Sequence, residues 1–111
     1  MRTKRARDLD KLWNENKLFV LQVLKDVMVE KYGGGGEIFE NSFIGIRSKK
    51  DNPFNLAFLT SDEKTKICVC MDPRGKGKFT IIRVNKETKK HHIVNGIDGV
   101  YLHDKILSIL E

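Results

Sequence analysis

The sequence is poor in cysteine and in long apolar runs, and each shortage excludes a class of protein. Two cysteines among 111 residues cannot build the disulfide framework of a small secreted domain. Apolar runs such as Leu18–Leu21 fall far short of the roughly 18 residues that cross a bilayer. The first ten residues lack the apolar core of a signal peptide. We therefore expect a soluble, unsecreted protein with no membrane partner, located in the cytoplasm or, in a eukaryote, the nucleus.

Acidic residues are also scarce: 15 Asp and Glu face 21 Lys and Arg, which gives a formal net charge of +6. This balance excludes an acidic mimic of nucleic acid. Charged residues make up 32% of the chain and apolar residues 40%, but the apolar residues are clustered and periodic, which disfavours general disorder. Because 111 residues is close to the usual size of one domain, we expect a single hydrophobic core.

The basic excess is concentrated in two segments. The first, within residues 1–8, contains Arg2, Lys4, Arg5 and Arg7. The second, residues 73–92, contains Arg74, Lys76, Lys78, Arg83, Lys86, Lys89 and Lys90 against Glu87 alone. A localised excess is typical of a surface that binds phosphates. It is equally consistent with solvated hairpin turns whose lysines keep strand edges from pairing with other chains.

The apolar periodicity predicts an α+β fold. Helical spacing runs from Asp8 to Tyr32 and stops at the glycines 33–36, and Asn14–Asn16 interrupts it, so one kinked helix and two shorter helices are both compatible. Alternation with period two then predicts strands at residues 42–47, 54–59, 66–72, 78–84 and 91–94. Helical spacing returns from Val100 to Glu111.

Short connections between these strands predict an antiparallel meander of four to five strands with the N-terminal and C-terminal helices on one face. We expect residues 1–7 to form a basic, flexible leader. Residues 8–111 then form a single α+β domain.

The cysteine and glycine patterns do not match common cofactor sites. Cys68 and Cys70 share one face of a predicted strand, but their spacing differs from the two-residue gap of zinc knuckles. Glycines 33–36 follow a helix and precede a strand, which is the reverse of a nucleotide-binding P-loop. We therefore expect free thiols, a glycine cap or hinge, and neither metal nor cofactor.

The loop Arg74–Lys78 alternates glycine with basic residues, so backbone amides and ammonium groups could approach a phosphate closely. The loop at residues 85–90 adds further lysines at the opposite end of the strand, about 20 Å away. A nucleic-acid backbone running along the strand could contact both loops. Phe79 is the single aromatic residue in this stretch, which favours backbone contacts over base stacking.

The three histidines raise the alternative of a ribonuclease, which needs two titratable groups at one phosphate. His91 and His92 are neighbours on a predicted strand and point to opposite faces, while His103 lies on the C-terminal helix. The element order is similar to that of small ribonuclease toxins, in which case His91 or His92 would act as base and Arg83 or Lys90 would stabilise the phosphate.

The leading prediction is a non-enzymatic module that docks on RNA or DNA backbone, or on a nucleoprotein. The predicted contacts are the basic residues of both segments, Arg2 among them. A small inhibitor or adaptor that binds an acidic protein surface is the alternative, and a ribonuclease is the third.

Overall fold

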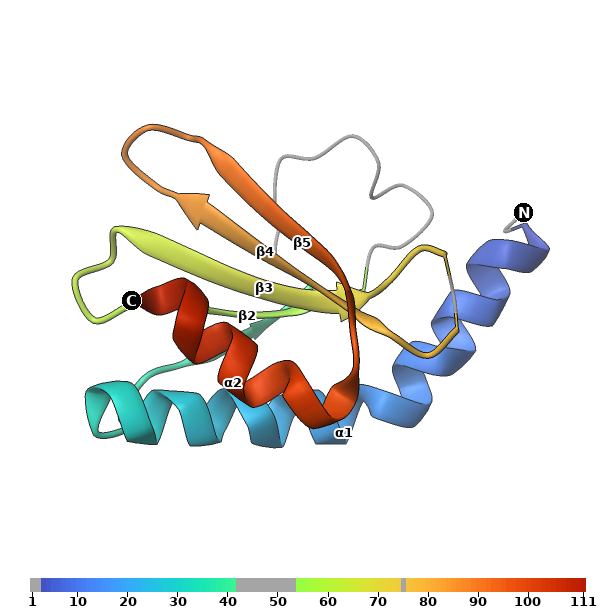
Figure 1. Ribbon diagram of the computed structural model, residues 1–111, viewed down its shortest axis with the longest axis horizontal. Helices are drawn as coiled ribbons and strands as arrows, with labels where there is room; N and C mark the ends of the chain where they lie inside the picture. The colour runs from blue at the N-terminus through green and yellow to red at the C-terminus, as the bar shows by residue number, and fades with distance from the viewer. Residues whose placement is uncertain (1–2, 42–53, 75) are drawn as a thin grey trace.

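The computed structural model describes residues 3–41, 54–74 and 76–111. Its elements are α1 (Lys4–Tyr32), β1 (Ile38–Glu40), β2 (Leu56–Leu59), β3 (Thr65–Met71), β4 (Phe79–Asn85), β5 (His91–Ile97) and α2 (Gly99–Leu110). The five strands form one antiparallel sheet in sequence order. Figure 1 shows both helices on the same side of this sheet. The predicted α+β meander is confirmed, with five strands.

The first helix starts earlier than the apolar pattern indicated. Thr3 is its N-cap, with a side-chain oxygen that accepts from the backbone N–H of Ala6 at 3.0 Å. The Ala6 side chain is buried at 1% exposure, which fixes this first turn against the rest of the domain. Residues 4–7, expected to belong to a flexible leader, are therefore part of α1.

The helix is continuous, but Figure 1 shows that it changes direction between its first and second halves. The Asn16 side-chain amide donates to the backbone oxygen of Leu12 at 2.8 Å. This donor competes for the carbonyl that the backbone N–H of Asn16 would use, a recognised cause of helix bending. The helix ends at Gly33, whose φ of 76° and N–H bond to Val29 form the predicted glycine cap.

The helix-facing side of the sheet forms the main core. Leu56, Val69 and Ile81 lie side by side on β2, β3 and β4 and are all buried. From α1 and α2 the core receives, among others, Trp13, Val20, Leu24, Val27, Leu102 and Ile106. Neither helix combines the length and apolar content of a membrane span.

The opposite side of the sheet carries a second buried cluster, formed by Ala57, Cys68, Cys70, Ile82 and Val84. The side chains of both cysteines are buried on this one side of the sheet, as their spacing predicted. The predicted strand at residues 42–47 lies outside the described residues, and the structure adds β1 at Ile38–Glu40. The other predicted strands match β2–β5, although β5 extends three residues further, to Ile97.

Candidate functional site

The structure joins two basic segments that are far apart in the sequence. The Arg5 guanidinium on α1 donates from Nε and from one terminal nitrogen to the backbone oxygen of Pro73, at 2.9 and 2.6 Å. This contact holds the start of α1 against the turn between β3 and β4. We call the resulting surface the N-terminal basic patch, and it consists of Lys4, Arg5, Arg74, Lys76 and Lys78.

Electrostatics in the first turn of α1 are unusual for a helix. Lys4, Arg5 and Arg7 lie there and no acidic residue does, although the helix dipole places partial positive charge at this end. Each cation near a helix N-terminus costs about 0.3–1 kcal/mol when exposed. The positive side chains and the positive end of the helix dipole thus add to one another and make this end favourable for a bound anion.

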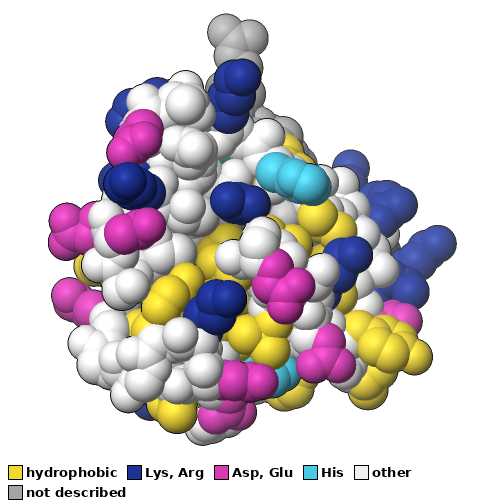
Figure 2. Space-filling view, turned by 60° about the vertical axis from the view of Figure 1, so that its left-hand side comes forward, with side chains coloured by type: hydrophobic (Ala, Val, Ile, Leu, Met, Phe, Trp, Pro, Cys, Tyr) yellow, Lys and Arg dark blue, Asp and Glu magenta, His cyan; other side chains and the backbone are white. Residues whose placement is uncertain are grey.

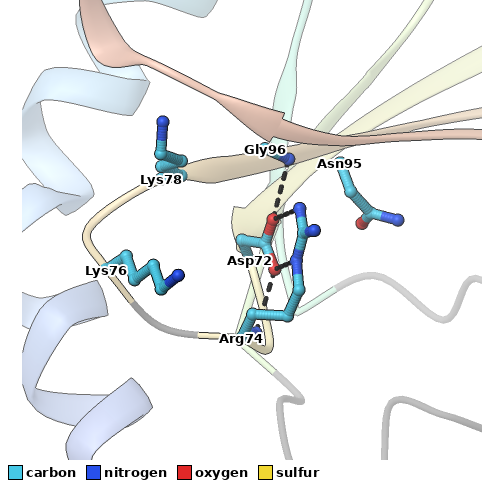
Figure 3. A pocket seen from close by; sticks show the side chains of 6 residues that line it. All are labelled: Asp72, Arg74, Lys76, Lys78, Asn95 and Gly96. Atoms are coloured by element: carbon cyan, nitrogen blue, oxygen red, sulfur yellow. Dashed lines mark hydrogen bonds and ion pairs between the residues drawn. The ribbon is translucent and has the colours of Figure 1, made fainter.

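A buried carboxylate organises the adjoining turn. Asp72 follows β3, its side chain is 2% exposed, and its oxygens accept four hydrogen bonds (Figure 3). Three come from Arg74, through its backbone N–H, Nε and a terminal nitrogen, at 2.9, 3.1 and 2.7 Å. The fourth comes from the N–H of Gly96 on β5, at 2.7 Å. The side-chain bond from Arg74, aided by backbone N–H groups, lowers the pKa of Asp72 to about 2.

This network fixes the Arg74 guanidinium while leaving it accessible. The Arg74 side chain remains 64% exposed, and two of its five N–H donors are used by Asp72. The pairing of β5 with β4 has a β-bulge at Asn95–Gly96. Gly96 leaves room for the Arg74 guanidinium, since a Cβ on Gly96 would lie 2.9 Å from an Arg74 nitrogen. Arg74 is therefore a preorganised donor with an open face.

Arg74 forms one wall of a polar hollow of about 360 Å³. Asp72, Lys76, Lys78, Asn95 and Gly96 complete it. In Figure 3 the Lys76 ammonium extends toward this hollow, whereas Lys78 points away from Asp72. Lys78 instead pairs with Asp98 at 3.0 Å. The backbone of Lys76 has a φ of 64°, a left-handed conformation that is strained for a residue with a side chain.

The predicted lysines at the β4–β5 turn form a separate group. Lys86, Lys89 and Lys90 lie at the opposite end of β4 from the N-terminal basic patch. All three are exposed, and Lys89 has a left-handed φ of 65°. The structure thus places the two basic turns apart along the strand, as the sequence indicated.

Other predicted contact residues occupy different positions. The Arg83 guanidinium donates to the backbone oxygen of Ile109 at 3.0 Å, where it satisfies a carbonyl in the last turn of α2. Arg7 is exposed on α1 but lines neither hollow next to Arg74. Arg2 lies outside the described residues.

The histidines occupy two different elements. His91 and His92 are successive exposed residues of β5, so their side chains alternate across the strand. His103 on α2 lies 2.9 Å from a carboxylate oxygen of Glu30 on α1. In residues 3–41, 54–74 and 76–111, no group of three or more His, Cys, Asp or Glu is arranged to hold a metal ion.

The sequence did not identify Asp72, Asn95 or Gly96 as part of a site. The signal for Asp72 was its position two residues before Arg74 at a turn containing proline, which is typical of an Asx turn.

Figure 2 shows Lys and Arg side chains along its right-hand side and mixed charges with apolar side chains elsewhere. No family model, curated protein or solved structure matches the chain.

Proposed function

We propose that the protein is a nucleic-acid-binding module that docks on the sugar-phosphate backbone through the N-terminal basic patch. The observation that carries this proposal is the contact between Arg5 and Pro73. It joins a basic helix start to a basic turn across a separation of 68 residues, so that cations from two distant segments form one surface. Phosphate contacts of this kind supply affinity and position without reading sequence.

Within the patch, the side chains have different roles. The charges of Arg74 and Lys78 are partly offset by Asp72 and Asp98, so Arg74 acts chiefly as an oriented hydrogen-bond donor. Lys4 and Lys76 form no ion pair within the described residues and supply most of the uncompensated charge, together with Arg5. Because exposed ammonium groups bind phosphate as mobile point charges, this surface favours a polyanion over one tightly gripped phosphate.

The test is a salt titration of fluorescent RNA and DNA oligonucleotides, single-stranded and duplex. The patch variant carries Lys4→Ala and Lys76→Ala. The matched control carries Lys86→Ala and Lys89→Ala, because it removes the same charge and likewise contains one left-handed lysine.

If two phosphate contacts are lost, the slope of log affinity against log salt should become shallower by about 1.4 on single strands or 1.8 on duplex in the patch variant. The control should retain the wild-type slope. Equal losses in the two variants would show that only net charge matters, and undetectable binding by the wild-type protein at low salt would refute the proposal.

A protein-binding role is the second candidate, because three large apolar side chains are exposed near the start of α2. Phe19, Val100 and Tyr101 are 44%, 82% and 63% exposed, and the Phe19 ring lies beside Gly99, where an added Cβ would be 3.4 Å from it. An adaptor using this surface should bind a protein partner that survives nuclease and high salt. The double variant Val100→Lys and Tyr101→Lys should release that partner.

A further inference from the structure

A second hollow adjoins the polar one and differs from it in chemistry. The first turns of α1 and the β3–β4 turn border an open hollow of about 470 Å³, within the range of about 300–1,000 Å³ that is typical of small-molecule sites. Leu9, Leu12 and Pro73 supply apolar surface. The charged members are Lys4, Arg5, Asp8 and Arg74. The hollow therefore combines an apolar wall with three cations and one carboxylate.

Arg74 is common to both hollows. Its guanidinium is held by the two hydrogen bonds that it donates to Asp72, so its plane does not have to be ordered when a ligand arrives. A fixed, exposed guanidinium is a stacking surface for a nucleobase. Lys76, on the other side of Arg74, is available for a phosphate of the same strand.

We infer that the ligand is a single-stranded nucleic acid and that one of its bases enters the hollow between α1 and the β3–β4 turn. This inference rests on the proposed function and specifies its substrate class. The base contacts Leu12 and stacks on Arg74, while neighbouring phosphates lie near Lys4 and Lys76. A paired base is held inside the stack of a duplex, and its extrusion costs free energy. Single strands should therefore bind more tightly than duplexes of equal charge.

The hollow provides a base contact that the sequence did not reveal. Among the described residues, no aromatic side chain lines it, and the scarcity of aromatic residues around Phe79 in the sequence favoured backbone contacts alone. In many proteins that bind single strands, the bases stack on aromatic side chains. Here the aliphatic surface of Leu12 and the Arg74 guanidinium take that role, and Asp8 offers an acceptor for the amino groups of a base. An acidic amphipathic peptide shares part of this chemistry, so it serves as the competing ligand in the test.

The decisive experiment compares three labelled probes with wild-type protein by fluorescence anisotropy at one salt concentration. They are a ten-nucleotide single strand, the same strand with abasic sites in place of every nucleotide, and a ten-nucleotide hairpin, which carries the same number of phosphates but holds its bases in a paired stem. We expect the strand with bases to bind about tenfold more tightly than the abasic strand. Because the two strands carry the same phosphates, their salt slopes should agree.

A matched pair of variants locates the base contact. Leu12→Gln places a polar group in the half-buried wall of the hollow, and Leu18→Gln makes the same change at a leucine of α1 that is 77% exposed. The former should remove most of the tenfold difference between strands, and the latter should preserve it.

The possible failures are distinguishable. Equal affinity for intact and abasic strands would overturn the inference that a base binds here, but it would leave the proposed backbone contact unaffected. This comparison uses the wild-type protein alone. If neither variant loses the difference in affinity between intact and abasic strands, the base does not bind in this hollow. The same conclusion follows if both variants fold and both lose it. Tighter binding of a Glu/Leu-rich peptide than of any strand would assign the surface to a protein. Undetectable binding of every strand would overturn the proposed function itself.

Discussion

Replacing Asp72 by Asn should destabilise the fold in a manner that depends on pH. The substitution preserves the size of the side chain but removes the charge that Arg74 and the Gly96 N–H bind. Asp72 links the end of β3 to the turn and to β5, which is not a neighbour of β3 in the sheet. The variant therefore tests whether one carboxylate holds the candidate site together.

The magnitude follows from the pKa of Asp72, which lies at about 2 against an ordinary value near 3.8. A carboxyl whose pKa is lowered this far on folding contributes about 2 kcal/mol to the free energy of unfolding when it is ionised. Above pH 4 that contribution is fully present. It is lost as the pH falls from about 4 to about 2, because the unfolded chain then takes up the proton first. At pH 7 the Asn variant should melt roughly 10 °C lower than the wild-type protein.

The assay is urea unfolding followed by the fluorescence of Trp13, the single tryptophan, which is 2% exposed in the folded state. Both proteins are measured at several values between pH 7 and pH 2. Other carboxylates titrate in both proteins, so the difference between the two free energies isolates Asp72. That difference should shrink from about 2 kcal/mol toward zero across the acidic range. A difference that is absent at pH 7, or that stays constant down to pH 2, would refute the reasoning.

Three further substitutions or measurements probe other features. Lys76→Gly should raise the free energy of unfolding by about 0.5–1 kcal/mol, since glycine adopts the φ of 64° without strain. Under the proposed function the same change should weaken the binding of nucleic acid. A lower urea midpoint would contradict the expected gain in stability. Gly96→Ala should lower the melting temperature and weaken binding, because its φ is 70° and its Cβ would lie 2.9 Å from Arg74, at a cost of about 1–3 kcal/mol. Burial raises the pKa of Cys68 to about 12, so its thiol should resist alkylation at pH 8 until urea unfolds the protein, and rapid labelling of the native state would show otherwise.

Periodicity in the sequence predicted most of the fold, because burial on one side imposes a spacing that can be read directly. The alternation around Ile81 and that around Val69 gave strands whose facing residues are indeed paired. The pattern failed where local signals were weak. β1 has three residues, too few to display a period, and the start of α1 is set by the Thr3 cap rather than by an apolar stripe.

The candidate site was less accessible to sequence reasoning, because its geometry depends on contacts between distant segments. The charge map identified Lys4, Arg5 and Lys76 as members of basic clusters. It could not place Arg5 on Pro73, since that contact depends on how α1 crosses the sheet. Nor could it distinguish Arg74, which is fixed and exposed, from Arg83, whose guanidinium is bound to Ile109.

The contact between Arg5 and Pro73 also bears on when the protein can first act. During synthesis the start of α1 leaves the ribosome long before the β3–β4 turn, which follows 68 residues later. A nascent chain therefore carries basic residues but no assembled patch. Under the proposed function, its affinity for single-stranded nucleic acid should rise only once the sheet has formed on the helix. Under the same proposal, a nucleic acid that binds only the assembled patch stabilises the folded chain by mass action, so the ligand would itself favour the last steps of folding.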